Sequence, residues 1–460
     1  MLTAEQFHIS PEYRLSMDSI ISKLFNFSEK VMAGGIDRTD RDEIKKRIGD
    51  SIFVSYGAKD ATPVNIIRRA LLPSTGRYNA SVYFSSEKAT VDTAAFINGT
   101  MTRYLDYNDT YLSKEALHPS DNIPPILAVS EAMDIKGERA IRAIDVAYEV
   151  VGALSDAICI RDLGWDHVTY ISISSAAGLA SLLQLEEKKF ENAVSLGLNN
   201  NISMRQTRAG ELSMWKGATA ADASRNSVFA LLLADEGFTG PSPIFTGEMG
   251  FFQQVTGGFN LELDNTRVRK TMIKNYPVEY HAMSAAEVSC GLRDRIKGKI
   301  QKIFVETFSV AHRIIIKDPE KLRPKTKETA DHSMPFIIAY SLLYGDPEPG
   351  SYSNSYLSDP KILDLMDKIT FTVTDKYNPM YPDSLPFSIH VITDSGEFRS
   401  DLNVPRGHFK NPYTWEDLKN KGVKMMGEDS ANAVLEVVKD FEKRDARELM
   451  EVVSNVSVKR

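Results

Sequence analysis

"SISSAAGLASLLQL", residues 172–185, is a helix-length segment built mainly from small side chains and leucines. A second segment, "WKGATAADASRNSVFALLLADEGF" at residues 215–238, has the same character. Small side chains let helix backbones approach closely, and protein interiors are packed without voids. We interpret both segments as helices of one large helical core.

The sequence on either side of these segments also predicts helices. Apolar residues recur at spacings of three and four in residues 13–33, and the pattern continues in "TVDTAAFINGTMTRYL" (90–105) and "NIPPILAVSEAMDI" (122–135). The proline pair of the last segment suits the first turn of a helix. The Gly- and Pro-rich stretch "FTGPSPIFTGEMGFF" (238–252) predicts a loop.

Strand patterns appear after about residue 275. "KIQKIFVETFSVAHRIII" (299–316) alternates over part of its length, and "KITFTVTD" (368–375) alternates throughout. "FSIHVITDSGEFRSDL" (387–402) predicts a hairpin that turns at Asp394-Ser395-Gly396. The tail "SANAVLEVVKDFEKRDARELMEVV" (430–453) returns to a helical pattern.

We therefore predict a mostly α fold with an α+β second domain. A discontinuous helical domain is expected over residues 1–272 and 406–460, because a helical tail after an inserted unit often docks back on the first domain. The α+β domain is expected over residues 273–405. A chain of 460 residues is long enough for two or three domains.

Composition excludes several classes of protein. The chain is 42% hydrophobic and 25% charged, which is typical of a globular protein, and its net charge of −7 gives no indication of a nucleic-acid partner. The two cysteines, Cys159 and Cys290, lie far apart, so a thiolate zinc site or an iron–sulfur cluster is not expected, and both are predicted to be small buried residues. Neither a secretory signal nor a membrane span is evident, which predicts a soluble cytoplasmic protein.

Common catalytic and metal-binding motifs are absent from the sequence. It contains no HExxH, no GxxxxGK[ST], no GxSxG and no GxGxxG after a predicted strand. The polar stretch "RYLDYNDTYLSKEALHPSDN" (103–122) invites comparison with a calcium loop. Counted from Asp106, the sixth residue is Tyr111 and the twelfth is Leu117, where an EF-hand needs glycine and an acid. No metal site is therefore predicted.

Polar residues in five segments remain as candidates for a pocket. The candidates are Asp106, Thr110 and His118; His167; Arg205, Arg208 and Lys216; Lys274 and His281; and His332. Each has a structural alternative: a helix cap for the aspartate, a hydrogen-bonded role for a histidine, and solvation or pairing for a cation. Together they suit a pocket for a polyanionic small molecule, because carboxylate substrates need cations and histidine exchanges protons near neutral pH.

Five segments, taken in order, resemble the MmgE/PrpD family. They are "RYLDYNDTYLSKEALHPSDN" (103–122), "GWDHVTYISISSAAGLA" (164–180), "RQTRAGELSMWKGATAADASRN" (205–226), "KNYPVEYHAMSA" (274–285) and "KETADHSMPF" (327–336). The family includes 2-methylcitrate dehydratases, cis-aconitate decarboxylases and iminodisuccinate epimerases. The resemblance implies a large helical domain completed by the C-terminal helices, a smaller α+β lid, an active site between them, a homodimer, and no cofactor.

The resemblance also implies the roles of individual residues. Expected catalytic residues are Asp106, His118, His167 and Lys274. Expected substrate-binding residues are Thr110, Lys216 and His281, and Arg205 and Arg208 are further candidates. The two lysines, assisted by an arginine, are expected to hold the charge that develops on a carboxylate, while the histidines and the aspartate move protons. Which group is the base and which the acid stays open.

The sequence of the first segment is most similar to that of the 2-methylcitrate dehydratase branch. The expected activity is a metal-independent hydro-lyase of propionate and 2-methylcitrate metabolism, with citrate as a further candidate substrate. The alternatives are decarboxylation of cis-aconitate to itaconate, another reaction of the family, or a protein that binds a tricarboxylate without catalysis. Phe336 stands where decarboxylase relatives have a tyrosine, which disfavours the decarboxylase.

Overall fold

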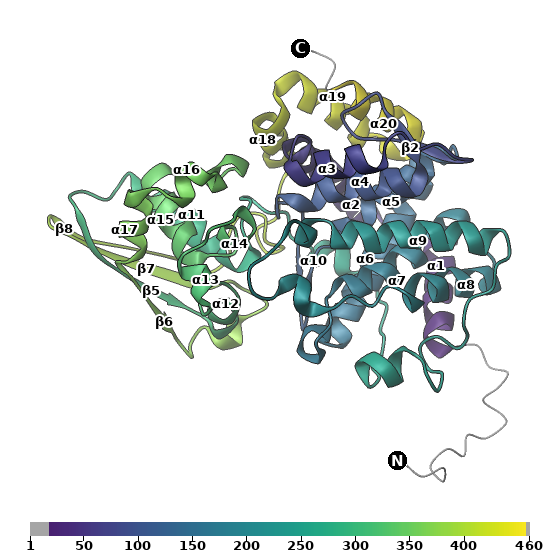
Figure 1. Ribbon diagram of the computed structural model, residues 1–460, viewed down its shortest axis with the longest axis horizontal. Helices are drawn as coiled ribbons and strands as arrows, with labels where there is room; N and C mark the ends of the chain where they lie inside the picture. The colour runs from purple at the N-terminus through teal and green to yellow at the C-terminus, as the bar shows by residue number, and fades with distance from the viewer. Residues whose placement is uncertain (1–17, 457–460) are drawn as a thin grey trace, which may run out of the picture.

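A computed structural model describes residues 18–456 of the chain. Two bodies lie side by side, a large helical body and a smaller α+β body (Figure 1). The helical body contains α1 (Ser19–Gly34), α2 (Arg38–Ala58), α3 (Thr62–Leu71), α4 (Val91–Tyr104), α5 (Ile123–Ala132), α6 (Gly137–Ala157), α7 (Val168–Leu183), α8 (Glu187–Asn199), α9 (Thr219–Asp235) and α10 (Arg267–Lys270). It is completed by α18 (Trp415–Met426), α19 (Glu428–Lys439) and α20 (Ala446–Asn455).

Small side chains set the packing of the helical body. Helix α7 packs against α6, α8 and α9 at its centre. A Cβ atom placed on Gly178 of α7 would lie 2.9 Å from the Ala147 Cβ of α6, and one on Gly99 of α4 would lie 2.9 Å from the Ala221 Cβ of α9. These distances are too short for a real side chain, so the prediction of tightly packed helices over 172–185 and 215–238 is confirmed.

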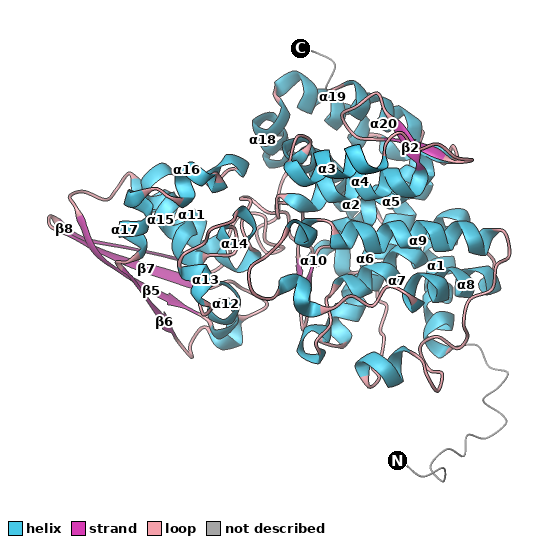
Figure 2. Ribbon diagram, viewed as in Figure 1, coloured by secondary structure: helices cyan, strands magenta, loops and turns pink. Residues whose placement is uncertain are grey.

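The α+β body contains one four-stranded sheet with the order β6-β5-β7-β8 (Figure 2). The strands are β5 (Ile300–Thr307), β6 (Ile369–Val373), β7 (Phe387–Thr393) and β8 (Gly396–Leu402). Its helices are α11 (Met283–Arg293), α12 (Ser309–Ile315), α13 (Pro319–Leu322), α14 (Lys327–Ala330), α15 (Met334–Tyr344), α16 (Asn354–Leu357) and α17 (Pro360–Met366). Strands β5 and β6 are parallel, and the other two pairs are antiparallel.

The predicted hairpin is present. Strands β7 and β8 pair from Phe387 opposite Leu402 to Thr393 opposite Gly396, so the turn consists of Asp394 and Ser395. Alternate residues of β7 are buried, which is the pattern of a strand with one face on a core. The mostly α fold with an α+β part is therefore confirmed.

Two expectations differ from the structure. The predicted helical tail is divided into α19 and α20, because Asp445 is the N-cap of a new helix and its backbone N–H donates to the Glu448 carboxylate at 3.2 Å in a capping box. Cys159 and Cys290, expected to be buried, are each partly exposed. The part of the 13–33 pattern before residue 18 lies outside the described residues, and α1 begins at Ser19.

Apolar side chains form two large cores, one for each body. The first gathers buried residues between positions 20 and 273 and again between 413 and 453. The second gathers residues between 272 and 391 together with Leu112. On this basis we propose the domain division at about residues 272 and 406. Among the described helices, none has the length and apolar character needed to cross a membrane.

A buried lysine of the C-terminal helices stabilises the junction between the two bodies. The Lys421 Nζ atom of α18 lies 2.6 Å from the Asp50 carboxylate of α2, and it donates to the carbonyl oxygens of Tyr107 at 3.1 Å and Lys274 at 2.9 Å. A short two-way backbone contact joins Thr110 and Met272 beside it. The segment after α4 and the segment that enters the α+β body are therefore held together by one buried cation.

We expect Lys421→Met to lower the free energy of unfolding by about 3–5 kcal/mol, because it leaves the Asp50 carboxylate buried without its cation. Urea unfolding followed by circular dichroism measures the loss. The double variant Asp50→Asn/Lys421→Met should recover part of it. Lys424→Met on the same helix is the matched control, since its ion pair with Asp346 is exposed and should contribute little. Equal effects of the two single lysine substitutions would contradict the assigned role.

Candidate active site

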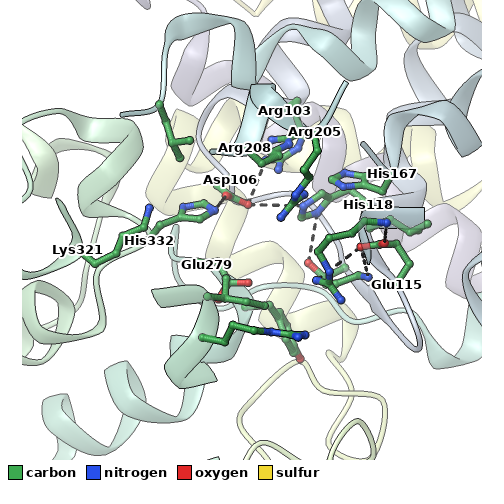
Figure 3. A pocket seen from close by; sticks show the side chains of 18 of the residues that line it. Arg103, Asp106, Glu115, His118, His167, Arg205, Arg208, Glu279, Lys321 and His332 are labelled. Carbon is green, nitrogen blue, oxygen red and sulfur yellow. Dashed lines mark hydrogen bonds and ion pairs between the residues drawn. The ribbon is translucent and has the colours of Figure 1, made fainter. Parts of the chain in front are cut away.

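A cavity of about 300 Å³ lies at the junction of the two bodies (Figure 3). The helical body contributes the polar lining residues Arg103, Asp106, Thr110, Glu115, His118, Arg161, Asp162, His167, Arg205 and Arg208. The α+β body and the segment leading into it contribute Lys274, Glu279, Tyr280, Arg313, Asp318, Lys321 and His332. Residues more than 200 positions apart in sequence therefore face one space.

Most of the sequence-predicted residues lie on this lining. They are Asp106, Thr110, His118, His167, Arg205, Arg208 and Lys274. Lys216 and His281 lie directly behind it, where each contacts a carboxylate that does line the cavity. Phe336 lies in α15, buried against Tyr340 and Tyr352, and is not part of the lining. The inference drawn from its missing hydroxyl therefore has no support in the structure.

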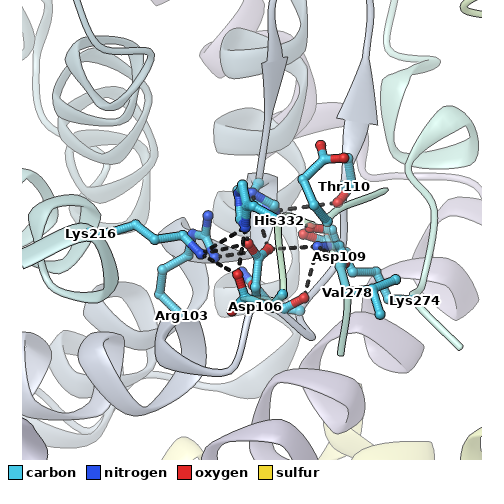
Figure 4. Close-up of polar contacts among 12 residues, drawn as sticks. Arg103, Asp106, Asp109, Thr110, Lys216, Lys274, Val278 and His332 are labelled. Carbon is cyan, nitrogen blue, oxygen red and sulfur yellow. Dashed lines mark hydrogen bonds and ion pairs between the residues drawn. The ribbon is translucent and has the colours of Figure 1, made fainter. Parts of the chain in front are cut away.

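The carboxylate of Asp106 is the centre of the site (Figure 4). Helix α4 ends at Tyr104, and Asp106 follows with φ of 53°, a left-handed conformation that aspartate tolerates better than most residues. Its Oδ1 atom lies 2.6 Å from Lys274 Nζ and 3.1 Å from an Arg103 nitrogen, and its Oδ2 atom lies 3.1 Å from Lys216 Nζ. Burial would raise the pKa of Asp106, but these cations outweigh it and hold the pKa well below its usual range.

The two lysines neutralise carboxylates of the protein itself. Lys274 Nζ donates to the Asp106 carboxylate, to the Asp106 carbonyl oxygen at 2.8 Å and to the Val278 carbonyl oxygen at 3.1 Å, which uses all three of its protons. Lys216 Nζ bridges Asp106 and Asp331, each at 3.1 Å. Both lysines therefore hold Asp106 in place.

Other cations are available to a ligand. The described lining contains seven lysines and arginines and five carboxylates. Among the described residues, Arg205, Arg313 and Lys321 have no carboxylate within 4.0 Å. Burial lowers the pKa of Lys321, which is the effect expected of a cation kept from water without a partner. The surplus of positive charge favours an anionic ligand.

Two histidines face the same space as these cations. The His118 Nδ1 atom lies 2.7 Å from the Asp109 carbonyl oxygen, so it carries the proton and Nε2 is the free acceptor of the neutral ring. Burial, followed by the charges of Arg103 and Lys274, lowers the pKa of His118 well below its ordinary value. Burial likewise lowers the pKa of His167 to about 3. The two rings lie 6.1 Å apart, and both are neutral at physiological pH.

His167 is held by a carboxylate that is itself paired with an arginine. Its Nδ1 atom lies 3.2 Å from the Asp166 carboxylate, which also accepts a hydrogen bond from Arg208 Nε at 3.0 Å. Arg208, 3.0 Å from that carboxylate, thus positions His167 through Asp166. Arg205 lies three residues earlier in the same turn (Arg205–Arg208) and has no carboxylate within 4.0 Å in the part of the chain that the structure describes.

Three side chains form a group with metal-ligand chemistry. Ligand atoms of Asp106, Asp331 and His332 lie within 4.8 Å of one another. Lys216 Nζ lies between the two carboxylates and 3.3 Å from His332 Nδ1. A cation of the protein therefore contacts all three members of the group.

Several lining residues were not predicted from the sequence. Arg103 precedes Asp106 by three residues on a helix end, a spacing that could have indicated the pair. His332 was noted among the polar segments without a role, and its Nε2 atom lies 3.5 Å from the Asp106 carboxylate. No local pattern marks Arg161, Glu279, Arg313 or Lys321 as members of one cavity, because only the tertiary fold brings them together.

The fold and the site define a two-body protein with a cationic cavity at the junction. Residues 22–264 match the MmgE/PrpD N-terminal domain, and residues 276–442 match the MmgE/PrpD C-terminal domain. The chain belongs to the MmgE/PrpD family.

Similar proteins include several dehydratases. A 2-methylcitrate dehydratase of Cupriavidus necator is 28% identical over 348 residues, which cover 68% of this chain and 70% of the relative. A 2-methylcitrate dehydratase of Escherichia coli (strain K12) is 29% identical over 305 residues, covering 60% and 61%. A fungal alkylcitrate dehydratase is 27% identical over 362 residues, covering 71% of each chain. The chain spans between 61% and 70% of the length of the first three relatives.

We expect Asp106→Asn to lower the free energy of unfolding by about 3–5 kcal/mol, because it leaves three buried cations without their shared carboxylate. Asparagine also tolerates the left-handed backbone conformation, so the loss of stability measures the effect of removing the carboxylate charge. Urea unfolding measures it. Asp222→Asn on α9, whose ion pair with Arg225 is about one-third exposed, is the control and should change stability little. Stability equal to that of the wild type would show that the cluster does not hold the junction.

Proposed function

We propose that the protein is a hydro-lyase that removes water from 2-methylcitrate to give 2-methyl-aconitate, with citrate as a further candidate substrate. The observation that carries the proposal is the junction cavity, where neutral histidines face cations that have no carboxylate partner among the described residues. The names of the similar dehydratases support the same chemistry. A tricarboxylate needs several cations, and Arg205, Arg313 and Lys321 can supply them.

Dehydration requires a base beside the carbon that carries the acidic proton. We assign this role to His118, because its Nε2 atom is the free acceptor and lies 3.9 Å from the Asp106 carboxylate. Once His118 takes the proton, that carboxylate stabilises the imidazolium. The cations hold the charge that develops on the adjacent substrate carboxylate.

The hydroxyl leaves from the neighbouring carbon. The carbon–oxygen bond breaks as the double bond forms, and the hydroxide needs one proton to depart as water. We propose that the imidazolium of His118, which carries the proton taken from carbon, gives this proton to the departing hydroxide beside the ring of His167. No net proton is gained or lost by the enzyme.

We propose further that the reaction needs no metal ion and no cofactor, because Lys216 fills the position between the two carboxylates. We also propose a homodimer and a role in propionate metabolism, which rest on the family resemblance, and a cytoplasmic location, which rests on the small number of cysteines.

Incubation of the purified, metal-free protein with 2-methylcitrate, citrate and cis-aconitate, followed by proton NMR, tests the function. We expect an unsaturated tricarboxylate from 2-methylcitrate. Addition of a chelator should leave the rate unchanged. Itaconate formed from cis-aconitate would place the protein with the decarboxylases. Binding of citrate without any product would indicate a tricarboxylate-binding protein.

The pH dependence tests the assignment of His118. Its neutral ring is the base, and its pKa is lowered, so kcat should stay constant as the pH falls through about 6.5 and decrease only at more acidic pH. Saturating substrate removes the contribution of substrate ionisation to binding. His118→Ala should lower kcat by about 10²–10⁴-fold with the fold intact by circular dichroism. An acidic limb with its midpoint at or above 6.5 would contradict the assignment.

A further inference from the structure

Glu279 is a carboxylate on the wall of the cavity that the proposed mechanism does not use. It follows Lys274 on the segment that enters the α+β body and precedes the short turn Tyr280–Ala282. In Figure 3 it lies at the edge of the space between His332 and His118. Its side chain is only 13% exposed. A shielded carboxylate in a cavity suited to anions needs an explanation, because it repels the ligand that the other residues attract.

His281 holds this carboxylate in place. The His281 Nδ1 atom lies 2.7 Å from one oxygen of Glu279, and the His281 backbone N–H donates to the other at 2.9 Å. The imidazole in turn is packed against the rings of Tyr381 and Phe308, with its Nε2 atom 3.3 Å from the Tyr381 hydroxyl. We propose a positioning role for His281 in place of the expected substrate-binding role, because it contacts Glu279 and does not line the cavity. Burial opposes ionisation, but His281 holds the pKa of Glu279 at about 2.

The other carboxylates of the lining differ from Glu279. Asp106 is neutralised by three cations, and Glu115 accepts the Arg161 backbone N–H at 2.9 Å with the guanidinium 3.6 Å away. Asp162 and Asp318 are exposed. Among the described lining residues, Glu279 alone is a shielded carboxylate with no lysine or arginine within 4.0 Å. Its remaining acceptor capacity is directed at whatever the cavity binds.

We propose that Glu279 accepts a hydrogen bond from the hydroxyl group of the substrate and thereby selects hydroxylated tricarboxylates. This inference rests on the proposed function, and it assigns recognition of the leaving hydroxyl to Glu279. A ligand that brings a hydroxyl donates a hydrogen bond to the carboxylate, whereas an analogue with hydrogen at that carbon displaces water from the carboxylate without supplying a donor to its remaining lone pairs. Sites built to hydrogen-bond a hydroxyl reject analogues that lack it for this reason.

Binding of two ligands tests the proposal. Citrate carries the hydroxyl, and propane-1,2,3-tricarboxylate has the same three carboxylates without it. Dissociation constants are measured by isothermal titration calorimetry in the His118→Ala background, so that citrate is not converted. We expect citrate to bind about 10- to 100-fold more tightly than propane-1,2,3-tricarboxylate, because a hydrogen bond to a charged group changes a dissociation constant by about this factor. In Glu279→Gln this ratio should fall toward 1, mainly because the analogue binds more tightly.

Two further variants separate the hydroxyl contact from general charge effects. Asp162→Asn removes the same charge from an exposed position of the lining, so both dissociation constants should change together and the ratio should stay. His281→Asn leaves the carboxylate but loosens it, so the ratio should take an intermediate value. An unchanged ratio in Glu279→Gln, with both ligands bound, would overturn the inference and leave the proposed function standing. If neither citrate nor propane-1,2,3-tricarboxylate binds, both the inference and the proposed function are overturned.

Discussion

The ion cluster at Asp106 is the interaction on which the rest of the structure depends. One carboxylate at the end of α4 is shared by Arg103, by Lys216 beside the small-residue helix α9, and by Lys274 at the entrance to the α+β body. A buried charge must be paired, so none of these segments can move independently without exposing an unpaired charge in the interior. The cavity exists at this junction because the cluster fixes the segments that line it.

This constraint divides the cations of the site into two groups. Lys216 and Lys274 neutralise carboxylates of the protein and are already saturated by close contacts. Arg205, Arg313 and Lys321 point to the cavity without a partner among the described residues. A ligand with several carboxylates can pair with the second group of cations, while the first group keeps its contacts with carboxylates of the protein. Burial and nearby cations keep His118 and His167 neutral, so that each has a ring nitrogen without a proton.

The two bodies contribute different functions to one space. The helical body supplies the histidines and the two arginines of the Arg205–Arg208 turn, while the α+β body supplies Lys321, His332 and the carboxylate of Glu279. Glu279 is tied to His281, and His281 to an aromatic cluster within the α+β body. The proposed recognition of the hydroxyl therefore depends on how the α+β body is placed against the helical body, which carries the proposed base.

Sequence alone determined the local elements and the chemistry present. Period-2 and period-3.6 patterns identified the β7–β8 hairpin and helices such as α4, and small-residue composition identified α7, because these features depend on neighbours along the chain. The family resemblance identified Asp106, His118 and Lys274 as residues of one site. The partners of each charge were decided by the tertiary structure alone. Contacts between segments far apart in sequence decide whether a lysine is paired with a carboxylate or available to a ligand. They also decide whether a histidine lines the cavity or lies behind a glutamate. No local sequence pattern records those contacts.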